Sequence, residues 1–420
     1  DFKFKEAIGD CPARARARLC IRGDQQEVKK DDNTFAPVAR MTAARVLFSH
    51  AVQEDLEAEV SDIGTAFPNA TLPEGMEVYM AVPSEASLYH KGDLSNKYFR
   101  INRALYGLPS SPRAFNQTLH ERMIFRGFKQ SLVDPCLYSR STSGNSTEPN
   151  QTLWVVVYVD DCLMVGAKHL VDDFKGELTD RFKMRHHGPI STFIGMEFSR
   201  NRGNRAGTIS MEKYVDTLVS EFLAPGFLPN ASPSTDNDAF THEDAPKTEA
   251  EKDEMKKCPY RRMVACLLWV ATTVRGDVAF PVKKLTQHFN NPGNKMWKSA
   301  LKTLVYLKTN PRKLRYTSTK RGALPSLKVY VDSDFAADRD TRKSTSGVSA
   351  FHNANMVNWI VKNQKSVALS TMEAEYMALT DVAREIIWLR RLLTDMGFPQ
   401  PAATTIHADN TGSIALTLNP

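Results

Sequence analysis

Two adjacent aspartates, Asp160 and Asp161, interrupt a run of apolar residues that otherwise extends from Leu153 to Ala167. The residues before the pair are apolar or aromatic and rich in valine, which is typical of a fully buried strand. The apolar run resumes at Cys162, so the stretch predicts a hairpin with two carboxylates at its tip. Because adjacent like charges repel each other and resist desolvation, a cation is expected to compensate them. Hard oxygen ligands suit Mg²⁺, and a solvated acidic turn is the alternative.

The overall composition limits the kinds of partner that the protein can have. Its 420 residues include 55 lysines and arginines and 48 aspartates and glutamates, so the net charge is +7 and favours a polyanionic partner. The six cysteines form no C-x-x-C pair, which predicts reduced thiols in an intracellular protein and no zinc site. No apolar run is long enough for a membrane span. The length suits two to three domains, and the start at Asp1 rather than Met indicates a piece of a longer polyprotein.

Several motifs occur in one order along nearly the whole chain. Tyr158-Val159-Asp160-Asp161 resembles the catalytic hairpin of reverse transcriptases, and its surroundings resemble the Pol polyprotein of copia-type long-terminal-repeat retrotransposons. Further segments that carry this resemblance are 34–40, 65–67, 105–108, 112–115, 193–198 and 209–222. The resemblance implies an RNA-directed DNA polymerase that copies RNA into DNA by two-metal-ion nucleotidyl transfer, with an attached, incomplete ribonuclease H.

The resemblance also implies a mixed α+β fold with three parts. They are a right-hand polymerase with fingers, palm and partial thumb (1–231), a linker and connection segment (232–325), and a ribonuclease H-like α/β domain truncated at its C-terminus (326–420). The linker is expected over 232–258, where almost no residue is apolar. Within the polymerase, 193–198 would grip the primer end and 209–222 would form the first thumb helix. Apolar periodicity predicts further helices over 41–56, 169–184 and 260–275.

One more polymerase acid comes only from the resemblance. Asp62 by itself would carry no signal, because turns and helix caps use aspartate constantly. In the family it is the first catalytic carboxylate at the end of a palm strand, where Asp62 and Asp160 would bridge two metal ions and Asp161 would support them. Phe67 falls where the family excludes the ribose 2′-hydroxyl, and core packing is a compatible role for it.

A set of arginines near the N-terminus alternates along the chain. Arg14, Arg16 and Arg18 have a spacing of two, which would place all three on one face of a strand. Such a face can bind phosphates or simply be solvated, and the spacing alone does not separate these alternatives. The resemblance assigns Arg16, Arg18 and Arg22 to the fingers, where they would contact the template and the phosphates of the incoming nucleotide.

Two departures from the family pattern favour a second interpretation, a degenerate non-enzymatic remnant that binds nucleic acid. Segment 105–115 resembles Leu-Tyr-Gly-Leu-Lys-Gln-Ala-Pro-Arg-Ala-Trp, and Arg113 keeps its place. Ser110, however, replaces the glutamine of the nucleotide pocket, and Gly276 replaces the proline of Thr-Arg-Pro-Asp. The intact polymerase acids favour the enzyme, because decay has no reason to spare them.

A second group of acids occurs after residue 326. Three predicted strands, a long helix from Ser370 and a fourth strand resemble ribonuclease H, with Asp332, Glu375 and Asp409 as the matching acids. A third interpretation of the Tyr-x-Asp-Asp hairpin is a two-metal polymerase of a different family. The ribonuclease H pattern after residue 326 disfavours it. Glu373 is the alternative to Glu375, although a capping box with Ser370 would explain it. The expected buried stripe of the helix is Tyr376, Leu379, Ala383, Ile386, Leu389 and Leu393.

The resemblance further implies the cofactors, partners and location of the protein. Each of the two acidic sites would use two Mg²⁺ ions, with Mn²⁺ as a substitute. The partners would be an RNA template, a DNA primer, an RNA–DNA hybrid, deoxynucleotides and other parts of the same polyprotein, without a membrane. The location would be the cytoplasm, in a virus-like particle, or the nucleus. The family's fourth nuclease acid would lie beyond Pro420, so weak ribonuclease H activity is expected of these residues.

Overall fold

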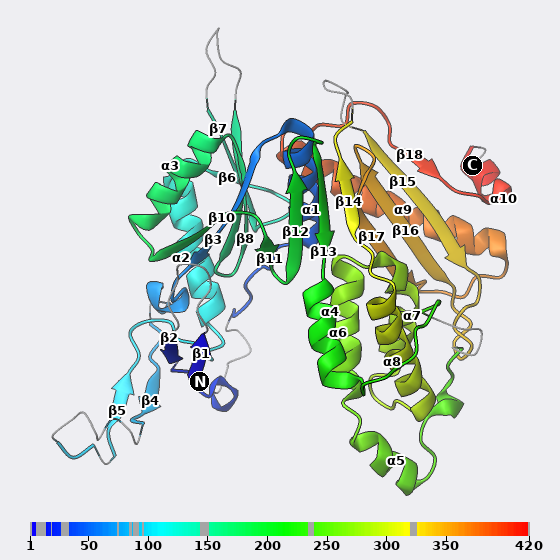
Figure 1. The fold of residues 1–420 in the computed structure, drawn as a ribbon, viewed down its shortest axis with the longest axis horizontal. Helices are drawn as coiled ribbons and strands as arrows, with labels where there is room; N and C mark the ends of the chain where they lie inside the picture. The colour runs from blue at the N-terminus through cyan, green and yellow to red at the C-terminus, as the bar shows by residue number, and fades with distance from the viewer. Residues whose placement is uncertain are drawn as a thin grey trace.

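The computed structural model describes most of the chain. The described residues are 2–5, 14–17, 19–26, 33–73, 75–83, 86, 92–94, 96–142, 151–233, 239–319 and 326–418. In the view of Figure 1, a sheet with helices lies on the left, a helical bundle at the lower centre and a second large sheet on the right. None of the helices in these residues is long and apolar enough to cross a membrane.

The first large sheet has six strands in the order β10-β3-β9-β8-β7-β6. Its strands are β3 (Glu57–Ile63), β6 (Lys129–Gln130), β7 (Leu137–Ser141), β8 (Thr152–Tyr158), β9 (Asp161–Gly166) and β10 (Met184–Pro189). Helices α2 (Ser111–Phe125) and α3 (Lys168–Thr179) pack on one face and α1 (Met41–Glu54) on the other. In β8, Val155 packs with α2 and α3 while Val156 packs with α1, which explains why the strand is apolar without interruption. The predicted hairpin is confirmed.

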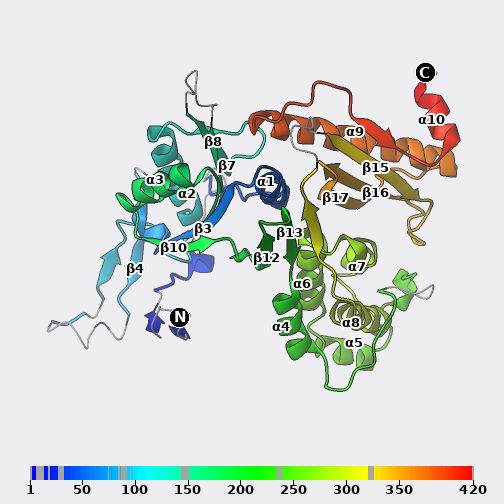
Figure 2. The same ribbon diagram turned by 45° about the horizontal axis from the view of Figure 1, so that its top comes forward.

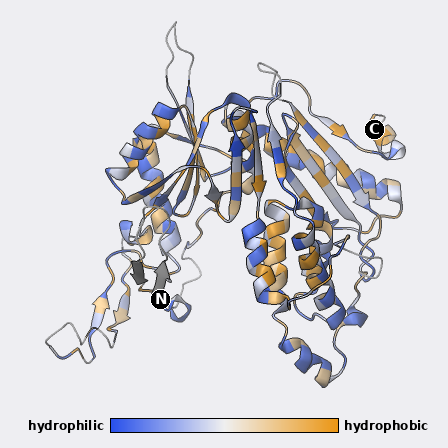
Figure 3. Cartoon of the chain, in the orientation of Figure 1, coloured by the Kyte–Doolittle hydropathy of each residue, from blue (hydrophilic) through white to orange (hydrophobic). Residues whose placement is uncertain are grey.

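A smaller sheet and a helical bundle follow. The sheet joins β11 (Thr192–Phe193), β12 (Met196–Asn201), β13 (Ala206–Ser210) and β14 (Leu314–Thr317). The helices are α4 (Glu212–Phe222), α5 (Glu249–Lys256), α6 (Tyr260–Thr273), α7 (Ala279–Thr286) and α8 (Asn294–Thr309). Hydrophobic residues gather on the bundle helices and in the strands of the sheets (Figure 3).

Three local predictions need correction in this region. The helix expected over 209–222 begins only at Glu212, because Ile209 and Ser210 belong to β13. The helix expected over 169–184 ends at Thr179 and is followed by β10. The expected linker 232–258 contains α5, which the side chain of Thr248 caps by accepting a hydrogen bond from the Glu251 N–H. A polar sequence therefore does form a helix here, through its own capping box.

The second large sheet has the order β17-β16-β15-β18. Its strands are β15 (Leu327–Asp334), β16 (Thr345–His352), β17 (Asn355–Asn363) and β18 (Thr405–His407), with β18 parallel to β15. Helices α9 (Thr371–Asp395) and α10 (Thr411–Leu418) accompany it, and α9 packs on β15 and β16. The predicted strand and helix order is confirmed.

The buried stripe of α9 differs from the expected one. Tyr376 and Ala383 are exposed, whereas Ala374, Ala378 and Val382 are buried. Small alanines let the helix backbone approach the sheet closely, so the contact surface follows them rather than the larger tyrosine. As a consequence, Glu375 is turned towards the sheet and is only 6% exposed.

Two short hairpins complete the fold near the N-terminus. They are β1 (Phe2–Lys5) with β2 (Arg14–Ala17), and β4 (Tyr79–Ala81) with β5 (Tyr98–Arg100). The largest hydrophobic core includes residues of the first sheet, the bundle and the second large sheet. Figure 2 shows α1 end-on between the first sheet and β17. This helix therefore lies where the two large sheets meet.

Candidate active sites

The hairpin tip brings three predicted acids to one end of the first sheet. Strands β3 and β9 are antiparallel neighbours, and their register places Asp62 directly opposite Asp161. The backbone N–H of Ile63 donates a hydrogen bond of 2.8 Å to the carbonyl oxygen of Asp160, which ties the end of β3 to the turn. Residues almost a hundred positions apart thus meet through ordinary strand pairing.

The turn that carries the acids is conformationally strained. Val159, between Tyr158 and Asp160, has a φ angle of 56°, in the left-handed region that β-branched residues avoid. A residue in this conformation lowers the stability of the fold by on the order of 1–3 kcal/mol, which the packing of the surrounding strands must offset. The left-handed conformation of Val159 makes the turn tight, so that Asp160 and Asp161 stay beside the end of β3.

The acids interact electrostatically. Burial, together with the nearby carboxylates of Asp160 and Asp62, raises the pKa of Asp161 to about 6. The same influences raise the pKa of the buried Cys162 thiol behind them. A divalent cation beside Asp161 would remove the repulsion from the neighbouring carboxylates. Mg²⁺ and Mn²⁺ prefer such carboxylate oxygens, but Asp62, Asp160 and Asp161 are not among the described residues whose ligand atoms lie within 4.8 Å of one another.

Arg185 is a site residue that the sequence analysis missed. It lies on β10 directly opposite Asp62, and its Nη1 is 3.6 Å from the Asp62 Oδ2. The expectation that a helix extends to residue 184 hid this strand. An arginine one strand away from a candidate catalytic acid could have been found only if β10 had been recognised.

The segments predicted to bind the nucleotide meet around Tyr106. The Phe67 ring lies 4.9 Å from the Tyr106 ring, between centroids. The N–H of Ile21 donates a hydrogen bond of 2.7 Å to the Tyr106 carbonyl, and Gly107, with a φ of 93°, packs against Ile21 so closely that a Cβ would overlap its carbonyl oxygen. Residue 22 is therefore held beside the segment that leads into α2.

The side chains of this region differ in their exposure and in their hydrogen-bond partners. Arg22 is exposed and pairs with Asp24 through two contacts of 3.0 and 2.8 Å. Arg113 is exposed in the first turn of α2, whereas Ser110 is buried and its hydroxyl has no hydrogen-bond partner among the described residues. Arg16 lies on β2, but its side chain and all of Arg18 lie outside the described residues.

The second acidic site lies at one edge of the second large sheet. Asp332, Glu375 and Asp409 each offer a carboxylate oxygen, and these oxygens lie within 4.8 Å of one another. Because β15 and β18 are parallel, their carboxyl ends bring Asp332 and Asp409 to the same edge. This is the one such group of three ligands within the described ranges.

The local contacts of Glu375 orient it towards the other two acids. The N–H and the hydroxyl of Ser333 each donate a hydrogen bond of 2.9 Å to Glu375 Oε1. The other oxygen, Oε2, is buried and has no partner among the described residues. Burial raises the pKa of Glu375, the bonds from Ser333 oppose the shift, and Asp332 and Asp409 add to it. A cation is the missing partner that this arrangement fits.

Glu373 has a different contact. Ser370 caps α9 by accepting a hydrogen bond from the Glu373 N–H, as predicted. The Glu373 carboxylate accepts a bond of 2.7 Å from the N–H of Leu369 rather than from Ser370, so the predicted capping box is wrong in its second half. Of the two glutamates, Glu375 is therefore the one that joins Asp332.

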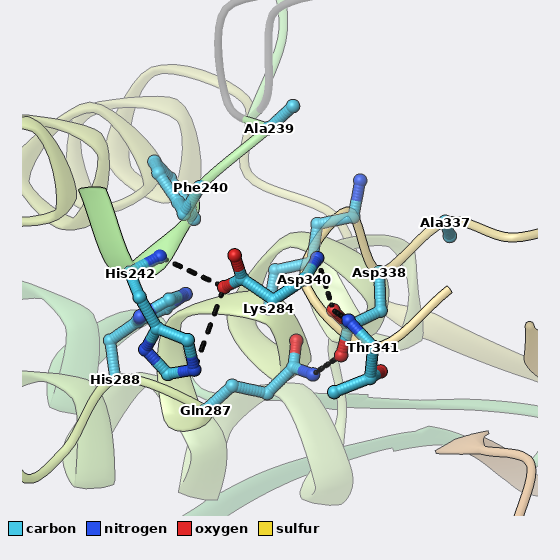
Figure 4. A pocket seen from close by; sticks show the side chains of 10 residues that line it. All are labelled: Ala239, Phe240, His242, Lys284, Gln287, His288, Ala337, Asp338, Asp340 and Thr341. Atoms are coloured by element: carbon cyan, nitrogen blue, oxygen red, sulfur yellow. Dashed lines mark hydrogen bonds and ion pairs between the residues drawn. The ribbon is translucent and has the colours of Figure 1, made fainter. Parts of the chain in front are cut away.

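A separate pocket of about 180 Å³ lies between the bundle and the second large sheet (Figure 4). The N–H of His242 donates a hydrogen bond of 2.9 Å to Asp340, and Gln287 donates one of 2.9 Å to Asp338. These bonds link 239–242 and the end of α7 to the loop between β15 and β16. None of the six predicted acids lines this pocket.

Comparison with known proteins defines the class. Residues 2–235 match the family described as "Reverse transcriptase (RNA-dependent DNA polymerase)", and the chain belongs to this family. It is similar to the "Retrovirus-related Pol polyprotein from transposon TNT 1-94" of Nicotiana tabacum, with 34% identity over 100% of the chain and 31% of the relative. The corresponding RE2 polyprotein of Arabidopsis thaliana is 29% identical over 97% of the chain and 27% of the relative. The predicted relationship to copia-type transposon polyproteins is confirmed.

A shorter relative matches over its whole length. The "Putative transposon Ty5-1 protein" of Saccharomyces cerevisiae is 28% identical over 77% of the chain and 100% of the relative. By contrast, the chain spans about a third of the length of the two plant polyproteins, 31% and 27%.

Proposed function

We propose that this chain is the RNA-directed DNA polymerase part of a copia-type Pol polyprotein. The observation that carries the proposal is the pairing of Asp62 with Asp161 beside Asp160 at the strained hairpin tip. In this proposal the first sheet is the palm, the bundle includes the thumb, and the parts are 1–231, 232–325 and 326–420. The partners would be an RNA template, a DNA primer and deoxynucleotides, with the rest of the polyprotein attached.

The acids would perform the chemistry by holding two metal ions. Asp62, Asp160 and Asp161 would hold these ions, with Asp161 in a supporting role. When bound, Mg²⁺ or Mn²⁺ lowers the pKa of a primer 3′-hydroxyl and neutralises the leaving pyrophosphate. Bound positive charge would lower the raised pKa of Asp161 and favour its ionised form. Before the metal ions bind, Arg185 would balance the charge of Asp62.

The residues around Tyr106 would form the nucleotide site. Arg22 and Arg113 are exposed cations on the two segments that meet there, and Arg16 and Arg18 would extend the basic surface towards the template. Phe67 would exclude the ribose 2′-hydroxyl. Phe67→Val should then admit ribonucleotides while deoxynucleotide use persists, measured as the ratio of kcat/KM for the two sugars. An unchanged ratio would leave Phe67 as a packing residue beside Tyr106.

The second acidic site would cut the RNA strand of an RNA–DNA hybrid. Asp332, Glu375 and Asp409 have the oxygen donors for two metal ions, and the unpartnered Glu375 Oε2 supports this use. The same sheet would then be a ribonuclease H-like domain attached to the polymerase.

Primer extension on an RNA template with Mg²⁺ tests the polymerase directly. The chain should extend a DNA primer, Asp160→Asn should abolish extension, and Asp173→Asn, at an exposed position of α3, should leave it unchanged. Binding of template and primer without any extension would instead support the degenerate, non-enzymatic remnant.

A further inference from the structure

Helix α1 carries a buried polar stripe on one side. Thr42, Arg45, Ser49 and Gln53 follow each other at steps of three or four residues, and none is more than 4% exposed. A helix places such residues on one face. Because a buried polar group without a partner is destabilising, this face must meet polar partners elsewhere in the protein.

Those partners come from a distant part of the chain. The hydroxyl of Thr42 donates a hydrogen bond of 2.9 Å to Asn358, and the amide of Asn355 donates one of 2.9 Å to Ser49. At the end of the stripe, Gln53 accepts a bond of 2.8 Å from the N–H of residue 319. The stripe is therefore matched along its length by β17 and by the segment that follows β14.

Arg45 is the centre of this contact. Its guanidinium donates hydrogen bonds of 2.8 Å to the carbonyl oxygens of Val357 and Thr273 and lies 4.1 Å from the ring centre of Trp359. Burial lowers its pKa to about 10, so it stays charged at neutral pH. A buried cation held by carbonyls and an aromatic ring links α1, α6 and β17 at a single point.

Gly276 packs against the same indole. A Cβ built on Gly276 would lie 3.2 Å from three ring atoms of Trp359, and the indole N–H donates a bond of 2.8 Å to Ala271. Gly276 and Arg45 therefore both contact the Trp359 ring. The glycine that departs from the family pattern thus has a local structural reason, and it does not indicate decay.

Helix α1 also packs on the acid-bearing strands β3 and β9. Val46 and Leu47 share a core with Val60 of β3 and with Leu163 of β9. These two strands carry Asp62 and Asp161 at their ends. Figure 2 shows the helix between them and β17. Any shift of α1 would therefore be transmitted to the strands that align the acids.

We propose that the polar stripe of α1 is a positioning surface, through which β17 and Trp359 hold the polymerase acids in register. Residues 345–363, outside the family match of 2–235, would then be a structural part of the polymerase site. The inference rests on the proposed polymerase function for its catalytic readout, although the mechanical coupling can be measured without it.

The test uses the full chain and two readouts. Arg45→Met should raise the amide exchange rates of β3 and β9 by at least about tenfold and lower kcat of primer extension by a similar factor, with a smaller change in the KM of the deoxynucleotide. The matched control is Arg384→Met, the same change at an exposed position of α9, which should alter neither readout. If Arg45→Met does not fold, Thr42→Val removes only the bond to Asn358 and the longer bond from Arg45, and should give the same pattern at smaller amplitude.

Coupling at the indole gives an independent check. Gly276→Ala should lower kcat because the new methyl group presses on Trp359, and the loss should be partly restored in Gly276→Ala with Trp359→Phe. Wild-type exchange of β3 and β9 in Arg45→Met and Thr42→Val would overturn the proposal. Absence of extension by the wild-type chain would instead count against the proposed function, and the exchange rates would still decide the coupling.

Discussion

At the hairpin tip, Asp62 and Asp161 face each other across one strand pair, whereas Asp332, Glu375 and Asp409 come from two strands and a helix. The first site has an internal cation, Arg185, beside one of its acids. Among the described residues, no lysine or arginine pairs with the three acids of the second site. The first site is thus partly neutralised by its own chain, while the second would depend more strongly on a cation in the proposed function.

The largest expected effect is a separation of the two proposed activities. Asp62→Asn should lower primer extension on the order of 10³-fold or more while cleavage of hybrid RNA persists, and Asp332→Asn should do the reverse. In the proposed mechanism each carboxylate would hold metal at one site only, so the losses should not cross. Gel assays of both activities on each variant measure this. A variant that removes both activities would show that the sites are not independent.

The next effect concerns the choice between neighbouring glutamates. Glu375→Gln should reduce cleavage by about 10²-fold or more, because it replaces an oriented metal ligand with a neutral amide. Glu373→Gln is the matched control and should cost only about 1 kcal/mol of stability through a weaker helix cap. Hybrid cleavage and thermal unfolding distinguish the two. Equal losses of cleavage would contradict the assignment of Glu375.

Two histidines at the contact between the regions, half-buried His50 and buried His352, predict a pH dependence of stability. His50 of α1 and His352 of β16 both lie near the Phe398 ring, and burial lowers their pKa values to about 3 and about 4. Since the folded pKa lies below the unfolded one, the unfolded state binds more protons. The stabilisation is complete above about pH 6.5 and is lost as the pH falls towards 4.

His352 alone should contribute a loss of roughly 2 kcal/mol between pH 7.5 and pH 5. Urea unfolding at the two pH values measures it. His352→Phe should flatten the dependence, because it removes the titrating imidazole. It should cost no hydrogen bond, since both ring nitrogens of His352 are without partners among the described residues. His169→Asn, at an exposed position of α3, is the control. An unchanged slope in His352→Phe would rule out this contribution.

The smallest effect sharpens the role of the internal cation. Arg185→Gln should lower the Mg²⁺ concentration for half-maximal extension by a few-fold, because a partly exposed ion pair contributes at most about 1 kcal/mol in competition with the metal. A Mg²⁺ titration of primer extension measures this. A large fall in kcat with an unchanged Mg²⁺ requirement would instead place Arg185 against the substrate.

Local sequence was sufficient for much of the architecture. The apolar run around Asp160, the strand order near Asp332 and the capped helix from Ser370 could all be predicted, because short-range patterns decide them. The preference for Glu375 over Glu373 came from the resemblance together with an expected capping box, of which only the bond from the Glu373 N–H to Ser370 is present. Asp62 needed the resemblance to a family, since an isolated aspartate carries no local signal.

Tertiary structure decided the features that depend on distant partners. Arg45 and Val357 are 312 positions apart, so the sequence shows an arginine in an apolar helix but not the carbonyls that justify it. Arg185 became visible only through the register of β10 with β3, and the buried side of α9 followed small alanines rather than Tyr376. Periodicity states which residues share a face, but the free energy of burial depends on the surface that the face meets, and that surface is assembled only by folding.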